Sequence, residues 1–338
     1  MGTSPDNKAP ADKHSGAVRS LTATSPLAAT AGVFAAATLC CLLWGSAFPA
    51  VKIGYELFAI ASDDIASQIA FAGARFLIAG LLVVAGMSIA RKTLYVPARS
   101  DAGAICLLAL FQTIGQYFFF YTGLATASGV ASSIINASSY FIAILLAALV
   151  FRTERLSSRK LVGCIIGFAG VVLINLDESS SSSGSLSGET LILLASLCSA
   201  ISTCLTSRLA EKHDPVLITG WQFVFGGLVL LVAGLAAGGS LTPANADSAP
   251  GAVAMLIYLA LVSAVAYSLW SKLLAENPVS RVSVYGFLTP VFGVVLSALF
   301  LGEGSEVNPV LAVAALALVS VGIVIVNREP QANETPQP

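Results

Sequence analysis

Charged side chains are scarce in this chain. Lys, Arg, Asp and Glu together make up 10% of its 338 residues, whereas an ordinary soluble domain carries about 25%. Hydrophobic residues make up 56%. This composition excludes an ordinary soluble domain. It favours an all-α membrane protein, because a chain in lipid must satisfy its own backbone hydrogen bonds, and a helix does so within one segment.

Groups that do acid–base or metal chemistry are missing from the apolar parts of the chain. The 18 acidic residues all fall in tails, loops or segment ends, and both histidines, His14 and His213, lie outside the apolar segments. An enzyme or a metal site would need a cluster of such groups, so we expect neither. A mid-membrane carboxylate of the kind used in proton relays is also missing, which disfavours proton antiport through a buried acid.

Two further absences narrow the function. No Gly-rich loop ends in Gly-Lys-Ser/Thr, the phosphate-binding pattern that an ATP-driven pump would need. The six cysteines all fall in apolar stretches without metal-ligand spacing, so we expect buried free thiols. We expect no cofactor and no nucleic-acid partner. The expected partners are the lipid bilayer and a small-molecule substrate, and the sequence leaves a homodimer open.

The chain does contain ten apolar segments, each close to the length of about 20 residues that crosses a hydrocarbon core as a helix. We predict transmembrane helices over residues 34–56, 65–90, 102–125, 129–151, 160–176, 189–209, 216–237, 251–274, 279–301 and 309–327. Residues 1–29 are rich in Ser, Thr, Pro and Ala, and we predict a disordered tail there.

A polar stretch divides the ten segments into two sets of five. Residues 177–188 are rich in Gly and Ser and hold no Lys or Arg, which is typical of a flexible linker. The predicted organisation is a tail, a five-helix half, the linker, a second five-helix half and a C-terminal tail, over residues 1–29, 30–176, 177–188, 189–327 and 328–338.

The basic residues predict the orientation of the chain in the membrane. All but two of the 17 Lys and Arg residues lie in the tails, loops and segment ends of one side, and the loops of the other side hold none. Cytoplasmic loops carry an excess of Lys and Arg. We therefore expect both termini in the cytoplasm and the Ser-rich linker outside.

A repeat relates the two halves. Five crossings is an odd number, so the second half must enter the membrane upside down relative to the first. Residues 73–76 (Gly-Ala-Arg-Phe) match residues 220–223 (Gly-Trp-Gln-Phe), and Glu154 matches Glu303. This pattern predicts ten transmembrane helices arranged as two inverted five-helix repeats, an arrangement typical of transporters that hold their substrate near the midplane.

Several short motifs carry a resemblance to a known family. They are Trp-Gly-Ser-Ala-Phe at 44–48 with Lys52, Arg-Phe-Leu at 75–77, Leu-Thr-Pro-Val-Phe at 288–292 and Leu-Gly-Glu at 301–303. Together with the ten segments and the repeat, they make residues 34–327 resemble the EamA-type ten-helix branch of the drug/metabolite transporter superfamily. The resemblance implies secondary transport, commonly export, of small polar metabolites, including amino acids, or of drugs.

The sequence departs from the family pattern at one position. Pro290 falls opposite Phe141 in the repeat, so the fourth segment lacks the helix-bending proline that many relatives have. A fourth segment without that bend would be straighter. We expect this difference to change the shape of the substrate pocket.

Arg75 lies about 15 Å into the second segment, close to mid-membrane, where an Arg costs roughly 2.5–3.5 kcal/mol. It should face the bundle interior and have a partner. One interpretation is an anchor for a substrate carboxylate or phosphate, which a guanidinium binds with two hydrogen bonds. The other is a structural Arg bonded to helix carbonyls or Gln side chains. Lys52, near the outer end of the first segment, is either an interfacial anchor or a gating residue, and Trp44 is a second candidate gating residue.

Polar and aromatic residues at helical spacing supply the other candidates for a site. Amide, hydroxyl and aromatic groups suit a wet central cavity for a polar organic solute. The alternative is that the small hydroxyl residues only promote close helix packing. The candidate substrate-binding residues, besides Arg75, are Gln112, Gln116, Tyr117, Asn136, Tyr140, Tyr267, Trp270 and Tyr285.

The sequence thus predicts a secondary transporter in the inner (cytoplasmic) membrane, which exports small polar metabolites such as amino acids, or drugs, by alternating access between its two halves. The alternative is a non-transporting membrane receptor or scaffold. That alternative would need a signalling or binding domain, and the tails are too short and polar to supply one.

Overall fold

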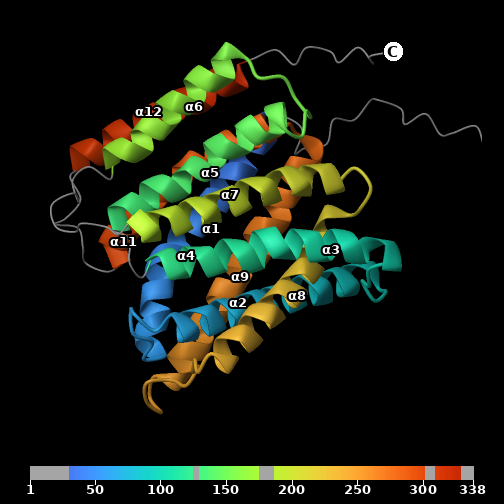
Figure 1. Ribbon diagram of the computed structural model, residues 1–338, viewed down its shortest axis with the longest axis vertical. Helices are drawn as coiled ribbons and strands as arrows, with labels where there is room; N and C mark the ends of the chain where they lie inside the picture. Colours follow the sequence, from blue (N-terminus) through green and yellow to red (C-terminus); the bar gives the residue numbers. More distant parts are fainter. Residues whose placement is uncertain (1–29, 125–128, 175–185, 301–308, 329–338) are drawn as a thin grey trace, which may run out of the picture.

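The described chain is helical throughout. The computed structural model describes residues 30–124, 129–174, 186–300 and 309–328, and within them every regular element is a helix (Figure 1). The prediction of an all-α protein is confirmed. The predicted N-terminal tail, most of the predicted linker and Glu303 lie outside the described residues.

The elements group into ten helical segments, because η1 to α4 follow one another without a break, as do α10 to α11. Each segment begins and ends within about one helical turn of its predicted bounds. The elements are α1 (Thr30–Leu57), α2 (Ile65–Arg91), η1 (Arg99–Asp101), α3 (Ala102–Ala109), η2 (Leu110–Gly115), α4 (Gln116–Leu124), α5 (Gly129–Leu149), α6 (Ser158–Ile174), α7 (Leu186–Leu209), α8 (Pro215–Ala236), α9 (Ala249–Glu276), α10 (Val279–Ser283), η3 (Val284–Phe287), α11 (Leu288–Phe300) and α12 (Pro309–Asn327).

Length and composition fit a membrane protein. Seven of the described segments are long and apolar enough to cross a bilayer, and the stretches Ile135–Leu149 and Val313–Asn327 form shorter apolar helices. Large aliphatic and aromatic side chains such as Phe34, Leu81, Leu228 and Val313 are exposed on the outside of the bundle. An exposed apolar surface of this extent is what a lipid-facing protein presents.

Two of the ten segments change their helix type midway. The third segment is π-helical over Leu110–Gly115, and the ninth is 3₁₀-helical over Val284–Phe287. Pro290 follows this 3₁₀ stretch and has no N–H to continue the hydrogen-bond ladder behind it. By contrast α5, which carries Phe141 where the other repeat has the proline, is one continuous α-helix.

Two close helix pairs lie at opposite ends of the molecule, with α6 beside α12 at the top of Figure 1 and α2 beside α8 near the bottom. Glycines allow both contacts. A Cβ at Gly80 of α2 would lie 2.5 Å from Val224 N, and a Cβ at Gly234 of α8 would lie 2.5 Å from Ala70 N. Small residues let membrane helices approach to backbone contact in this way.

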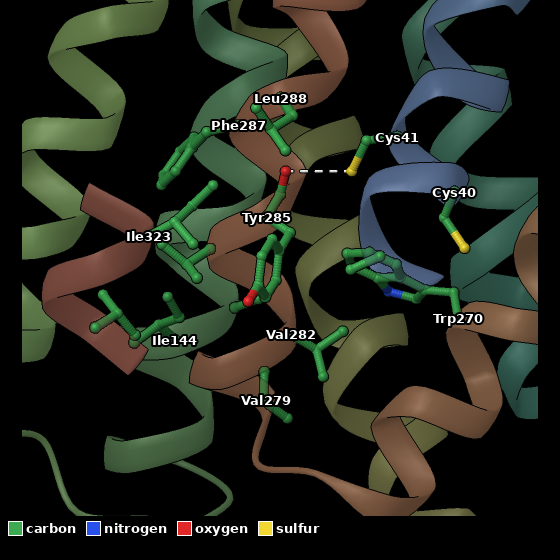
Figure 2. Packing of buried hydrophobic residues seen from close by; sticks show 14 of the residues in the cluster. Cys40, Cys41, Ile144, Trp270, Val279, Val282, Tyr285, Phe287, Leu288 and Ile323 are labelled. Atoms are coloured by element: carbon green, nitrogen blue, oxygen red, sulfur yellow. Dashed lines mark hydrogen bonds between the residues drawn. The ribbon is translucent and has the colours of Figure 1, made fainter. Parts of the chain in front are cut away.

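The largest buried cluster of the described residues draws on α1, α5, α7, α9 and α11 and extends into the α6–α12 pair. Figure 2 shows part of it, where the Cys41 thiol of α1 donates to the backbone carbonyl of Tyr285 at 3.2 Å. All six cysteines are free, as predicted, and four of them are buried. Cys106 is exposed and Cys198 is partly exposed, so the prediction of burial is wrong for these two.

Candidate functional site

A group of aromatic rings joins α1 to α9. Trp44 of α1 packs edge-on against Tyr267 and Trp270 of α9, with both ring centroids 5.0 Å away. Its indole Nε1 is buried and has no hydrogen-bond partner among the described residues. The ring geometry is favourable for aromatic pairs, whereas the unpaired N–H is a cost that a bound acceptor would remove.

Tyr117 extends the aromatic group toward α2. Its hydroxyl lies 3.2 Å from the hydroxyl of Tyr267, and its ring centroid lies 4.5 Å from that of Phe76. Phe76 stacks on Phe223 of α8 at 5.0 Å. Five helices, α1, α2, α4, α8 and α9, therefore contribute to one continuous set of rings.

Arg75 borders this set and is 5% exposed. Its Nε donates to the carbonyl of Leu259 at 3.2 Å and to the hydroxyl of Ser263 at 2.8 Å, both on α9. The guanidinium carbon also lies 5.2 Å from the ring centroid of Phe76. The bond to a helix carbonyl agrees with the structural interpretation of this residue, and it accounts for one of the five guanidinium N–H groups.

Tyr140 of α5 packs against the 3₁₀ stretch. Its hydroxyl donates to Thr289 Oγ1 at 3.4 Å, and its ring centroid lies 5.8 Å from that of Phe287. The ring covers the backbone of Gly286, where a Cβ would overlap it. Glycine is therefore required at this position for Tyr140 to approach.

Several buried polar atoms around these rings have no hydrogen-bond partner within the described part of the chain. Native proteins leave few such atoms unpaired, and the exceptions are often at functional sites. Besides Trp44 Nε1, they include Tyr55 Oη, Gln112 Oε1, Ser268 Oγ and Ser283 Oγ. Gln112 lies within the π-helical stretch, an irregularity that frequently marks a functional site.

The other predicted site residues are placed less centrally. Gln116 and Asn136 are half-buried, and neither side chain bonds to another described residue. Tyr285 is buried in the apolar core, and Figure 2 shows its ring near Val282 and Ile323. Lys52 is exposed on the last turns of α1.

Sequence reasoning missed Tyr55 and Phe76 as parts of this site. Tyr55 lies near the end of α1, where a tyrosine is normally interpreted as an interfacial anchor, yet its hydroxyl is buried. Phe76 follows Arg75 directly. Its position in the family-like Arg-Phe-Leu motif was the available signal.

Most of the charged contacts lie away from the aromatic rings, in the loops. Glu154 accepts from Lys160 Nζ at 2.6 Å, from Ser280 N at 2.9 Å and from the Ser280 hydroxyl. Arg91 pairs with Asp214 at 2.7 Å. These contacts fix loops that hold most of the basic residues, and Arg75 takes no part in them.

Comparison with known proteins gives consistent matches. A family model described as the EamA-like transporter family matches residues 30–176 and again residues 186–328. An uncharacterised transporter of Archaeoglobus fulgidus is 31% identical over 266 residues, which cover 78% of this chain and 86% of that protein. A probable amino-acid metabolite efflux pump of Salmonella typhimurium is 26% identical over 278 residues, covering 79% and 86%.

Two further matches extend this result. An uncharacterised inner membrane transporter of Escherichia coli is 27% identical over 296 residues, covering 84% of this chain and 87% of that protein. A solved crystal structure has the same fold, with a TM-score of 0.70 at 15% sequence identity over 87% of this chain and 96% of that one.

Proposed function

The chain belongs to the EamA-like transporter family, and from this membership we propose that it is a secondary transporter that exports small polar metabolites, such as amino acids, or drugs across the cytoplasmic membrane. The proposed location follows the inner membrane relative and the positive-inside distribution of Lys and Arg. From the same distribution we propose that both termini lie in the cytoplasm.

The helix contacts support the proposed inverted repeat. Helix α1 of the first half contacts α9 and α11 of the second half. Its counterpart α7 of the second half contacts α4 and α5 of the first half. The second segments of the two halves, α2 and α8, pack together, as do the fifth segments, α6 and α12. A two-fold axis between the halves would exchange partners in this way.

One observation carries the proposed site: a single aromatic and polar cluster is built from both halves. Trp44 and Tyr117 come from the first half, and Tyr267 and Trp270 come from the second. In transporters with inverted repeats the substrate binds at such an interface, next to helices with irregular stretches. The π-helical stretch at Leu110–Gly115 and the 3₁₀ stretch at Val284–Phe287 meet this description.

The proposed mechanism is alternating access, in which the two halves rock about the cluster and expose it to one side of the membrane at a time. A substrate would replace the unmade hydrogen bonds of Trp44 Nε1 and Tyr55 Oη. Because these atoms are paired only when a solute is present, binding offsets a cost that the empty protein carries.

Solute efflux from proteoliposomes tests the proposal. Vesicles that contain the purified protein are loaded with a panel of amino acids, organic acids and drugs, and efflux is compared with that from protein-free vesicles. We expect saturable efflux of at least one solute, and a loss of that efflux in Trp44→Ala. Trp221→Phe is the matched control, because Trp221 lies outside the cluster and bonds to the carbonyl of Tyr95. Absence of efflux for the whole panel would favour the non-transporting receptor or scaffold.

A further inference from the structure

The guanidinium of Arg75 is held at one edge only. Its Nε donates to Leu259 O and Ser263 Oγ, and the Ser263 hydroxyl in turn donates to Leu259 O at 3.0 Å. These contacts fix the plane of the group against α9. The four N–H groups of the two Nη atoms take no part in these contacts. They form the end of the side chain, and their geometry allows them to donate to two oxygens at once.

Within the described residues, neither Nη atom has a hydrogen bond or an ion pair. The acidic residues of the chain lie in tails, loops and segment ends, so the described helix interiors offer no carboxylate as a counter-charge. A cation that is 5% exposed and has no counter-charge among the described residues is costly to keep inside a membrane protein. Its persistence in the fold indicates a site whose anion comes from outside the chain.

A second donor lies nearby. The Tyr55 hydroxyl is buried and makes no hydrogen bond within the described residues, although the Tyr121 hydroxyl and the Arg75 guanidinium lie in its surroundings. Tyr55 packs against the buried cluster that contains Phe76. A guanidinium and a phenol hydroxyl together can donate to both oxygens of a carboxylate. The ring centroid of Phe76 lies 5.2 Å from the guanidinium carbon of Arg75, and that of Tyr267 lies 6.5 Å from Phe76. These two rings would provide an apolar surface for the rest of a solute.

We propose that the two Nη groups of Arg75, with the Tyr55 hydroxyl, bind the carboxylate of the transported solute, and that the site prefers an apolar monocarboxylate anion to a zwitterionic amino acid. This inference rests on the proposed transport function and names its substrate class. A single cation matches a single negative charge, which a carboxylate carries and a phosphate dianion exceeds.

The preference over amino acids follows from charge. The α-ammonium group of an amino acid is attached to the carbon next to the carboxylate, so it would lie beside the guanidinium and be repelled by it. The described part of the cluster holds no carboxylate to receive that ammonium group. A carboxylic acid without the amino group binds the guanidinium and the rings without this repulsion.

Binding of four phenyl-containing probes that differ in charge tests the preference without any transport step. The probes are 3-phenylpropanoate (anion), phenylalanine (zwitterion), phenethylamine (cation) and 3-phenylpropanamide (neutral), and binding is read from tryptophan fluorescence of the purified protein. The chain has three tryptophans, of which Trp44 and Trp270 report on the cluster. Trp221→Phe removes the tryptophan that lies outside the cluster, and the fluorescence change on binding should remain.

We expect 3-phenylpropanoate to bind on the order of tenfold more tightly than phenylalanine, and Arg75→Gln to lose a similar factor for the anion alone, because hydrogen bonds to charged groups are the stronger ones. Arg75→Lys keeps the charge and loses the geometry that donates two hydrogen bonds. Its affinity for the anion should lie between those of the wild type and Arg75→Gln. Equal binding of the anion and phenylalanine by the wild type would overturn the inference, and this comparison needs no variant to fold. So would unchanged binding of the anion by folded Arg75→Gln.

The two proposals fail separately. Selective binding of 3-phenylpropanoate without flux would contradict the proposed transport function and support the anion site. Flux of phenylalanine in preference to 3-phenylpropanoate would support the proposed transport function and contradict the inferred preference for a monocarboxylate anion.

Discussion

The hydroxyl of Tyr117 in α4 lies 3.2 Å from the hydroxyl of Tyr267 in α9. One tyrosine belongs to each half of the chain, so this hydrogen bond closes the cluster across the interface between the halves. Both rings also contact Phe76, with centroids 4.5 and 6.5 Å away. Any movement of one half against the other must change this contact.

Tyr267→Phe should weaken solute binding while keeping the ring. A hydrogen bond contributes about 0.5–1.5 kcal/mol, so we expect the half-saturating solute concentration of efflux to rise about two- to tenfold. Tyr258→Phe is the control on the same helix, because it removes a hydroxyl that lies 2.7 Å from Ser46 Oγ at an exposed position. Equal effects of the two variants would show that the loss is not specific to the cluster.

Gly80→Ala should disrupt the contact between α2 and α8. The added methyl would lie 2.5 Å from Val224 N and 2.7 Å from Gly220 O, both backbone atoms that cannot turn away. Overpacking of this kind costs about 1–3 kcal/mol, which thermal unfolding in detergent should detect. Gly86→Ala on the same helix meets nothing within 4 Å, and we expect it to be neutral or to stabilise by up to about 1 kcal/mol through helix propensity.

Glu154→Ala should destabilise the protein by about 3 kcal/mol, because it removes the acceptor of the Ser280 N–H and the counter-charge of Lys160, which then bonds only to the Arg155 carbonyl, in a poorly exposed site. The side chains of Lys160 and Glu154 are only 14% and 8% exposed. Glu211→Ala is the matched control. Its partner Arg208 is 3.6 Å away and both side chains are more than half exposed, so we expect less than about 1 kcal/mol. Similar losses in unfolding experiments would contradict the structural role of Glu154.

Asp64 should stabilise α2 as its N-cap, accepting from Ser67 N at 3.0 Å. Asp64→Ala should cost about 1 kcal/mol, whereas the neighbouring Asp63→Ala, whose carboxylate caps nothing, should cost less. Hydrogen bonding from the Ser67 side chain and N–H lowers the pKa of Asp64. The folded-state pKa therefore lies below the unfolded value, so the stabilisation is complete at neutral pH and is lost as the pH falls through the folded-state pKa. A difference between wild type and Asp64→Ala that stayed constant into strong acid would contradict this assignment.

The helical segments could be predicted from sequence because spanning a bilayer requires about 20 apolar residues, and the chain shows ten such runs. Hydropathy does not report helix type, so the π-helical stretch at Leu110–Gly115 could not be predicted. At the 3₁₀ stretch the same limit affected a site residue. Tyr285, predicted as a substrate-binding residue, lies in this 3₁₀ stretch and is buried in the apolar core.

Arg75 was predicted to be buried with a partner, and both expectations agree with the structure. Its partners are a helix carbonyl and Ser263, which lie 184 and 188 residues away in sequence, and no local pattern connects such distant positions. The burial of the Tyr55 hydroxyl depends in the same way on helices from across the chain.

Access to the cluster from the two faces of the membrane tests the central claim most directly. Tyr117→Cys in proteoliposomes is treated with a membrane-impermeant thiol reagent on one face or the other, with wild type giving the background from its six native cysteines. The account predicts labelling above background from both faces, with the balance shifted by a transported solute. Labelling from one face only, whatever solute is present, would contradict alternating access at this site.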